Sequence, residues 1–438
     1  DPMCVNCFKE CHKYCKNNIN TAEKTKYLEQ EMSDPIAIDT LAKRMTTDFI
    51  NKVSNDVVAE LGKGTNKMWG VTWGYDVIAD ANSAFPKEDP TPAECFLLIA
   101  RKDLAAWKKA LKNELHYVEA FARTGAEFIF KGGTSLLVLL NEPRRLSTDI
   151  DIIVDHETDV DSYIERAGRT FPFVSVEEHK RKGANDIEKR HFRFHFLSPS
   201  TGKEIYILLD VVFEDNPYLK VTEHPIRSSL LLSEDEDLMV NLPDKNCILG
   251  DKLTAFAPHT TGIPFGVGKE LEIIKQLFDC WTLLQEMDDY KMVASVYDKV
   301  SRIELGYRGL ESTPADCLKD TIDSCICIMG RGSVRPEEYT DFSSGINAIQ
   351  GHIFVGRING ENAGVYASEV MYLAANILTG QTEFERITNP DAFRDVPLNL
   401  KGTKKISSIR NTNPLAYAYM VKSLQLLNKN GLYTKGIL

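Results

Sequence analysis

The sequence has no apolar stretch long enough to cross a membrane. Apolar runs such as Cys95 to Ala100 and Val370 to Ala375 are far shorter than the ~20 residues that a membrane-spanning helix needs. The chain also lacks a basic start followed by an apolar segment, which a secretory signal would have. These absences predict a soluble, cytoplasmic protein with no membrane partner.

An excess of basic charge is missing as well. The 52 lysines and arginines are outnumbered by 63 acidic residues, and the formal net charge is −11. This balance argues against a protein that binds nucleic acid non-specifically, although it leaves room for a local basic groove. Hydrophobic residues make up 43 % of the chain and charged residues 26 %, which is the composition of an ordinary globular protein.

Four of the ten cysteines crowd the start of the chain. Cys4, Cys7, Cys11 and Cys15 follow one another at spacings that place them on one face of a helix. Structural zinc sites usually take ligand pairs from different elements, so we predict no metal here and keep zinc or an iron–sulfur cluster as alternatives. The remaining cysteines stand in apolar or helical contexts, as expected of reduced core thiols: Cys95, Cys247, Cys280, Cys317, Cys325 and Cys327.

The periodicity of apolar residues changes along the chain and predicts four segments. Residues 1–36 form the cysteine-rich start, and residues 37–124 carry apolar residues at helical spacing. Residues 125–230 alternate strands (127–130, 148–154, 190–197, 204–213) with helices (134–140, 158–169). Residues 231–438 return to the helical period. The predicted fold class is α+β, with a mixed-sheet core between a helical N-terminal region and a C-terminal helical bundle.

The stretch KGGTSL at residues 131–136 joins a predicted strand to a predicted helix. Gly132 and Gly133 carry no side chains, so their backbone N–H groups can approach a ligand closely. Thr134 and Ser135 add hydroxyl donors where the helix begins, and a helix N-terminus favours anions. We therefore predict that these four residues bind the phosphates of a nucleotide.

Three aspartates follow the glycine turn. Asp149 and Asp151 stand two residues apart in the stretch TDIDIIV, so both carboxylates face one side of a strand while the isoleucines face the core. Asp210 is the single charged residue in the strand sequence IYILLDVVF, and a charge in such surroundings needs a partner. A divalent cation shared by the three carboxylates would supply it, and oxygen ligands favour Mg²⁺ or Mn²⁺.

The order KGGTSL followed by RRLSTDIDI resembles the polymerase-β-type nucleotidyltransferase superfamily, and within it the AbiEii/AbiGii type IV toxin family of abortive-infection systems. In that family a later helix carries a Lys-Leu-x-Ala motif, which here begins at Lys252, and another carries Lys-Asp-x-x-Asp, which here begins at Lys275 and ends at Asp279. The first aspartate of that motif is replaced by Gln276. The resemblance implies nucleotide binding by Lys252 and Lys275 and a catalytic role for Lys252 and Asp279.

These features predict a two-metal nucleotidyltransferase that moves a nucleoside monophosphate from an NTP to an acceptor hydroxyl. Asp149 and Asp151 would hold both metal ions, and Asp210 would hold the one that activates the acceptor. Lys252 would neutralise the leaving pyrophosphate. The resemblance implies RNA as acceptor, with the 3′ end of tRNA as one candidate, and a cognate antitoxin as partner.

Two other functions stay open. The same metal site could serve transfer of a nucleotidyl or phosphoryl group to a protein, and Gln276 leaves room for an inactive nucleotide-binding module. His191 and His195 share the polar face of a predicted strand with Arg193. Because histidines on such a face are usually surface residues, both are left outside the predicted catalytic set.

Overall fold

The computed structural model describes residues 118–147, 149–169, 173–179, 189–197, 204–228, 238–353, 358–398 and 404–432. Contacts divide the chain into two compact units, and the second comprises residues 118–170, 176–194 and 207–438. Of the described residues, only the ends of three strands, at 173–175, 195–197 and 204–206, belong to the first unit. The cysteine-rich start and nearly all of the predicted N-terminal helical region lie outside the described residues.

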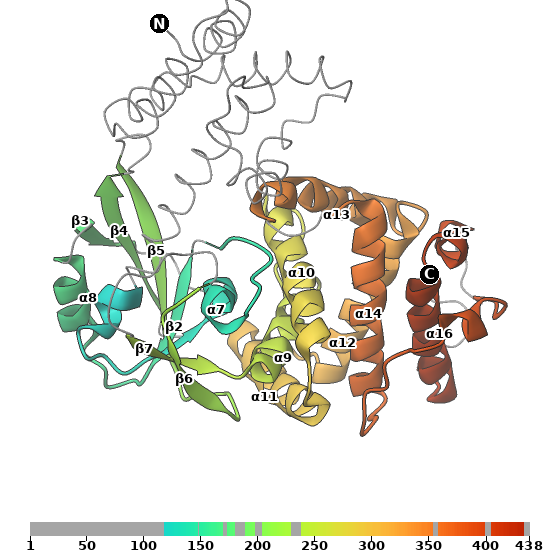
Figure 1. Cartoon of the computed structure of the whole chain (residues 1–438), viewed down its shortest axis with the longest axis horizontal. Helices are drawn as coiled ribbons and strands as arrows, with labels where there is room; N and C mark the ends of the chain where they lie inside the picture. The colour runs from blue at the N-terminus through green and yellow to red at the C-terminus, as the bar shows by residue number, and fades with distance from the viewer. Residues whose placement is uncertain are drawn as a thin grey trace, which may run out of the picture. The chain divides into compact units, whose positions relative to one another are not determined.

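The core of the second unit is a seven-stranded mixed sheet (Figure 1). Its strands lie in the order β3-β4-β5-β2-β1-β7-β6. The central strand β2 runs parallel to β5 and antiparallel to β1, and β1 runs parallel to β7. The strands are β1 Ile129–Lys131, β2 Ile150–Val154, β3 Phe173–Glu178, β4 Lys189–Leu197, β5 Glu204–Phe213, β6 Val221–Pro225 and β7 Met239–Pro243.

In the described part of the chain, two short α-helices accompany the sheet and eight α-helices follow it. The first two are α7 Gly132–Leu139 and α8 Val160–Gly168. The others are α9 Lys245–Ala255, α10 Glu270–Glu286, α11 Tyr290–Arg308, α12 Pro314–Gly330, α13 Pro336–Ala348, α14 Gly360–Leu378, α15 Lys404–Thr412 and α16 Pro414–Lys429. The α+β fold predicted from the sequence is confirmed.

The sheet continues past residue 230, where the sequence analysis places the start of the helical segment. Strand β7 lies at residues 239–243 and pairs with both β1 and β6. Strands β3, β6 and β7 are five or six residues long, so each carries little of the alternation that identifies a strand in a sequence. The core therefore reaches residue 243, and helix α9 follows directly.

The helices share one large apolar core. Helix α14 is buried along most of its length and packs against α10, α12 and α16, while α9 packs between α10 and α11. Among the described cysteines, Cys247, Cys280, Cys317, Cys325 and Cys327 are free and buried, as predicted for core thiols. None of the helices in the described part of the chain combines the length and apolarity of a membrane span.

Helix α9 starts at a well-defined point. Asp244 caps it by accepting a hydrogen bond from the backbone N–H of Asn246 at 2.9 Å. The Asn246 amide also donates to the Asp288 carboxylate at 2.7 Å, which fixes the start of α9 to the loop between α10 and α11. These contacts set the position of the residues that α9 presents to the sheet.

Two helical glycines test the packing of the bundle. A Cβ on Gly345 of α13 would overlap the carbonyl oxygen of Glu270 in α10, whereas a Cβ on the exposed Gly306 of α11 would meet nothing within 4 Å. We expect Gly345→Ala to lower the free energy of unfolding by about 1–3 kcal/mol through overpacking. Gly306→Ala should raise it by roughly 0.5–1 kcal/mol, because alanine is the better helix former. Urea denaturation measures both, and equal effects would contradict the close α10–α13 contact.

Candidate active site

Two of the three predicted aspartates are direct partners in the sheet. Asp151 of β2 is in register with Asp210 of β5, and the neighbouring pair Ile150 and Leu209 is buried. Side chains of register partners lie on the same face of a sheet, so the two carboxylates face the same side. Asp149 is exposed and stands one residue before β2 begins. The structure thus brings Asp151 and Asp210 together and places Asp149 at the end of the same strand.

The pKa of Asp151 reports the electrostatics of this group. Burial and the negative charges of Asp210 and Asp149 raise it to about 7, although the positive charges of Lys131 and Lys252 act in the opposite direction. Asp149, Asp151 and Asp210 are therefore close enough for their charges to interact, as predicted from the sequence. In the absence of a cation this field is only partly compensated by the two lysines.

Gly132 lies directly against Asp151. It has a φ of +81°, and a Cβ at this position would overlap the Asp151 carboxylate. Position 133 also has no space for a side chain. A Cβ on Gly133 would come within 2.5 Å of the Arg145 guanidinium and 2.7 Å of the Ser147 hydroxyl. The two glycines let the first turn of α7 approach both the acidic strand, which is β2 with Asp151, and the loop that precedes β2. The backbone N–H groups of that first turn have no acceptor within the helix.

The hydroxyls of Thr134 and Ser135 are used inside the fold. Both residues are fully buried. The Thr134 hydroxyl donates to the backbone carbonyl of Asp149 at 2.5 Å, and the Ser135 hydroxyl donates to that of Gly132 at 2.9 Å. Both hydroxyl protons are thus used within the fold, and the predicted role of Thr134 and Ser135 in nucleotide binding stays a prediction. The two hydroxyl groups fix the shape of the turn. The backbone N–H groups of residues 132–135 remain available to a ligand.

Lys252 belongs to a buried charged cluster with residues of α10. Its ammonium lies 3.0 Å from the Asp279 carboxylate and 3.2 Å from the Gln276 amide oxygen. Gln276 thus provides a neutral acceptor at the position of the family's first aspartate. Lys252 is 9 % exposed and close enough to Asp151 to lower its pKa, so it links the helical bundle to the acidic strand.

Asp279 is held by two cations at once. The Arg145 guanidinium donates to its two carboxylate oxygens at 2.5 and 2.6 Å, and Asp279 is 1 % exposed. Burial alone would raise the pKa of Asp279, but the charges of Arg145 and Lys252 outweigh it and hold the pKa below its ordinary value. Both carboxylate oxygens of Asp279 are thus occupied by basic side chains. The predicted catalytic role of Asp279 stays a prediction.

Lys275 lies at the edge of this cluster. Its ammonium pairs with Glu272 one turn earlier at 2.8 Å. Lys275 and Arg145 both help to lower the pKa of His352, and burial of the imidazole is the larger cause. The predicted role of Lys275 in nucleotide binding stays a prediction.

Three residues near the aspartates were not in the predicted set. Arg145 binds Asp279, His191 of β4 lies with its Nδ1 2.6 Å from the Asp210 carboxylate, and Lys131 is in register with Asp151. The sequence carried a signal for each: Arg145 precedes the aspartate motif, Lys131 precedes the glycines, and His191 lies on the polar face of its strand. None of these sequence features shows which aspartate each residue contacts in the fold.

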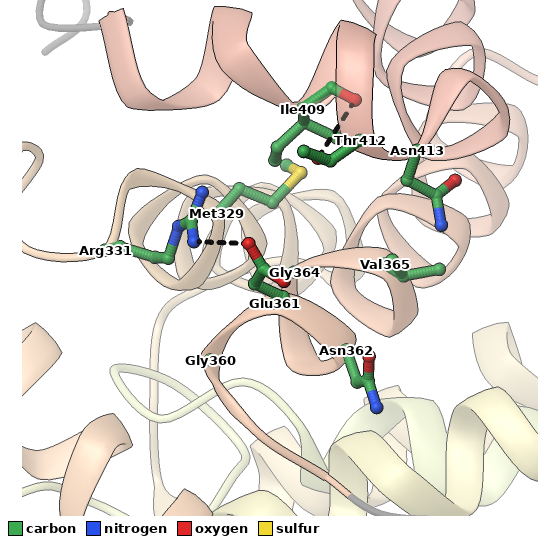
Figure 2. A pocket seen from close by; sticks show the side chains of 10 residues that line it. All are labelled: Met329, Arg331, Gly360, Glu361, Asn362, Gly364, Val365, Ile409, Thr412 and Asn413. Carbon is green, nitrogen blue, oxygen red and sulfur yellow. Dashed lines mark hydrogen bonds and ion pairs between the residues drawn. The ribbon is translucent and has the colours of Figure 1, made fainter.

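A separate pocket lies among the C-terminal helices (Figure 2). Its volume is about 100 Å³, and it is enclosed by the end of α12, the start of α14 and the segment that joins α15 to α16. Arg331 and Glu361 form an ion pair at 3.4 Å in its lining, and Met329 and Ile409 contribute apolar side chains. None of the predicted site residues lines this pocket.

The acidic group suits a hard divalent cation in chemical type. Among the described residues, no three histidine, cysteine or acidic side chains already form a complete metal site. Mg²⁺, however, is usually bound by one or two carboxylates together with substrate phosphates and water, rather than by a cage of protein ligands. The Asp151–Asp210 pair beside the glycine turn at the start of α7 is compatible with that requirement.

Comparison with known proteins shows which family this part of the chain resembles. Residues 118–320 match the family described as nucleotidyl transferase AbiEii toxin, Type IV TA system. The match covers the glycine turn, all three aspartates, Lys252 and Asp279, and it confirms the resemblance recognised in the sequence. No curated protein matches the chain.

Two solved structures from Helicobacter pylori are distantly similar. JHP933 is 13 % identical with a TM-score of 0.35, and the alignment covers 62 % of this chain and 92 % of that one. A candidate nucleotidyltransferase is 12 % identical with a TM-score of 0.33, covering 64 % of this chain and 97 % of that one. The similarity to the AbiEii family rests on the match of residues 118–320 to the family model and not on these structures.

The raised pKa of Asp151 leads to a stability test. Its folded-state value of about 7 lies above the ~3.9 of an unfolded aspartate, so the wild type loses stability as pH rises from about 4 to 7. Asp151→Asn avoids this loss. We expect the variant to melt above the wild type in metal-free buffer, with a larger difference at pH 8 than at pH 5.

Thermal melts with EDTA at both pH values measure this difference, with Asp155→Asn, an exposed residue just after β2, as control. If Asp151→Asn instead melts below the wild type at pH 8, Lys131 and Lys252 stabilise the charged Asp151 carboxylate. That result would contradict the raised pKa of Asp151.

Proposed function

We propose that the chain transfers a nucleoside monophosphate from an NTP to an acceptor hydroxyl and releases pyrophosphate. The observation that carries this proposal is the placement of one acidic pair, Asp151 and Asp210, directly against the glycine-opened start of α7. A helix N-terminus attracts phosphate groups, and carboxylates on adjacent strands suit the cation that accompanies a nucleotide. The AbiEii match over the same residues makes nucleotidyl transfer the supported activity class.

The chain's own groups have distinct tasks in this reaction. The backbone N–H groups of Gly132, Gly133, Thr134 and Ser135 bind the β- and γ-phosphates. The acceptor oxygen forms a bond to the α-phosphorus, the bond from phosphorus to the pyrophosphate oxygen breaks, and the hydroxyl proton passes to solvent. Lys252 stabilises the negative charge that develops on the departing pyrophosphate.

Mg²⁺ or Mn²⁺ would be held by Asp149, Asp151 and Asp210. Such a cation, when bound, neutralises phosphate charge and lowers the pKa of the acceptor hydroxyl. Asp151 and Asp210 are partly buried, and the side chain of Asp210 is 25 % exposed, so their interaction with a cation is stronger than it would be in bulk water. Lys131, on the other side of Asp151, limits the repulsion between the carboxylates until the cation binds.

The contacts of Lys252 favour an active enzyme over an inactive nucleotide-binding module. Replacement of the family's aspartate by Gln276 removes one negative charge but keeps an oxygen acceptor at 3.2 Å from the ammonium. Asp279 is shared between Arg145 and Lys252, so the buried cluster of these three residues carries one more positive charge than negative. An anionic triphosphate would balance that excess.

The proposed biological role is taken from the match to the AbiEii toxin family. A type IV toxin acts together with an antitoxin, so a cognate antitoxin is the proposed partner, in the cytoplasm. RNA, with the tRNA 3′ end as a candidate, is the proposed acceptor. A protein acceptor is the alternative, because the same phosphate and carboxylate groups would serve a side-chain hydroxyl equally well.

Labelled nucleotides test the reaction and its acceptor together. We expect label from [α-³²P]NTP, but not from [γ-³²P]NTP, to appear on RNA when the protein is incubated with total RNA and Mg²⁺. Asp151→Asn should reduce transfer at least about a hundredfold, since several kcal/mol of transition-state stabilisation are lost, while the control Asp155→Asn should retain it. α-Label on protein would indicate the alternative acceptor, γ-label would indicate phosphoryl transfer, and binding without transfer would contradict the proposal.

A further inference from the structure

His191 is the closest neighbour of the acidic pair on the side away from β2. In the sheet order, β5 lies between β4 and β2, so Asp210 has Asp151 on one flank and His191 on the other. The His191 Nδ1 lies 2.6 Å from Asp210 Oδ1, and the two side chains are 16 % and 25 % exposed. This is a short hydrogen bond in a partly buried place.

We infer that His191 is a positioning residue for Asp210, an inference that rests on the proposed function. A carboxylate accepts hydrogen bonds, so the contact assigns the proton to Nδ1 of His191. The bond commits Oδ1 and fixes the plane of the carboxylate, which leaves Oδ2 for a divalent cation. Partners of this kind orient ligating carboxylates, and their loss typically weakens metal affinity about 10–100-fold.

The surrounding residues support a role beyond sheet stability. Among the described residues, His191 is the basic side chain that pairs with Asp210, whereas Lys131 and Lys252 act on Asp151. His191 is therefore the group that restrains the outer of the two carboxylates. His195, four residues further along the same strand, faces the same side but pairs with Glu204 at 3.0 Å, which makes it a matched control.

Mn²⁺ binding to the full-length protein tests this inference without any need for activity. Titration followed by the EPR signal of free Mn²⁺ gives Kd for the wild type and for His191→Ala, His191→Asn, His195→Ala and Asp151→Asn. We expect His191→Ala to weaken Mn²⁺ binding at least about tenfold and His195→Ala to leave it unchanged. His191→Asn should restore most of the affinity, because the asparagine amide can donate from nearly the same position as Nδ1.

The possible outcomes separate the two proposals. If the wild type binds Mn²⁺ and loses it in Asp151→Asn, but His191→Ala binds as the wild type does, His191 has only a structural role and the inference is overturned. If neither the wild type nor Asp151→Asn binds Mn²⁺, the proposed metal-dependent function fails and the inference fails with it. Should His191→Ala not fold, His191→Leu, which fills the space without a donor, replaces it in the comparison with His191→Asn.

Discussion

The bidentate pair between Arg145 and Asp279 is the interaction on which the rest of the site depends. It joins the loop that precedes the acidic strand to the middle of α10, across 134 positions of sequence. Both partners are almost fully buried, at 7 % and 1 % exposure. Removal of one partner from such a pair leaves the other charge uncompensated and typically costs about 3–5 kcal/mol. The geometry of the site is therefore linked to the stability of the fold.

Each functional group is connected to this pair through a short chain of contacts. Asp279 holds Lys252 at 3.0 Å, and the Arg145 guanidinium lies where only a glycine fits at position 133. The turn after Gly133 is tied through the Thr134 hydroxyl to the backbone of Asp149. The glycine turn, strand β2 and Lys252 of α9 are thus all connected to the Arg145–Asp279 pair. The negative charge of Asp151 and Asp210 faces this positively charged cluster, and a nucleotide with its cation would complete the balance.

The sequence was sufficient for features that are encoded locally. The glycine turn, the alternation around Asp151 and the helical spacing after residue 244 each depend on neighbouring residues, and the structure has the predicted elements in these places. Asp210 was identified because a lone charge in an apolar strand requires a partner, and it is in register with Asp151.

Features that depend on tertiary contacts could not be predicted from neighbouring residues in the sequence. Arg144 and Arg145 are adjacent, yet Arg144 lies over the ring of Trp281 at 5.1 Å while Arg145 binds Asp279. Nothing in the local sequence distinguishes them. His191 looked like a surface histidine because its partner is on another strand, and β7 is identified only by its pairing with β1 and β6.

The most direct test of the central claim, that the acidic strand and the buried cationic cluster form one nucleotide site, is a crystal structure with Mn²⁺ and a non-hydrolysable α,β-methylene NTP. The account predicts anomalous Mn²⁺ density at Asp151 and Asp210, with the triphosphate lying between the first turn of α7 and Lys252. A nucleotide bound elsewhere, for example in the pocket beside Met329 and Arg331, or Mn²⁺ away from the two aspartates, would contradict it.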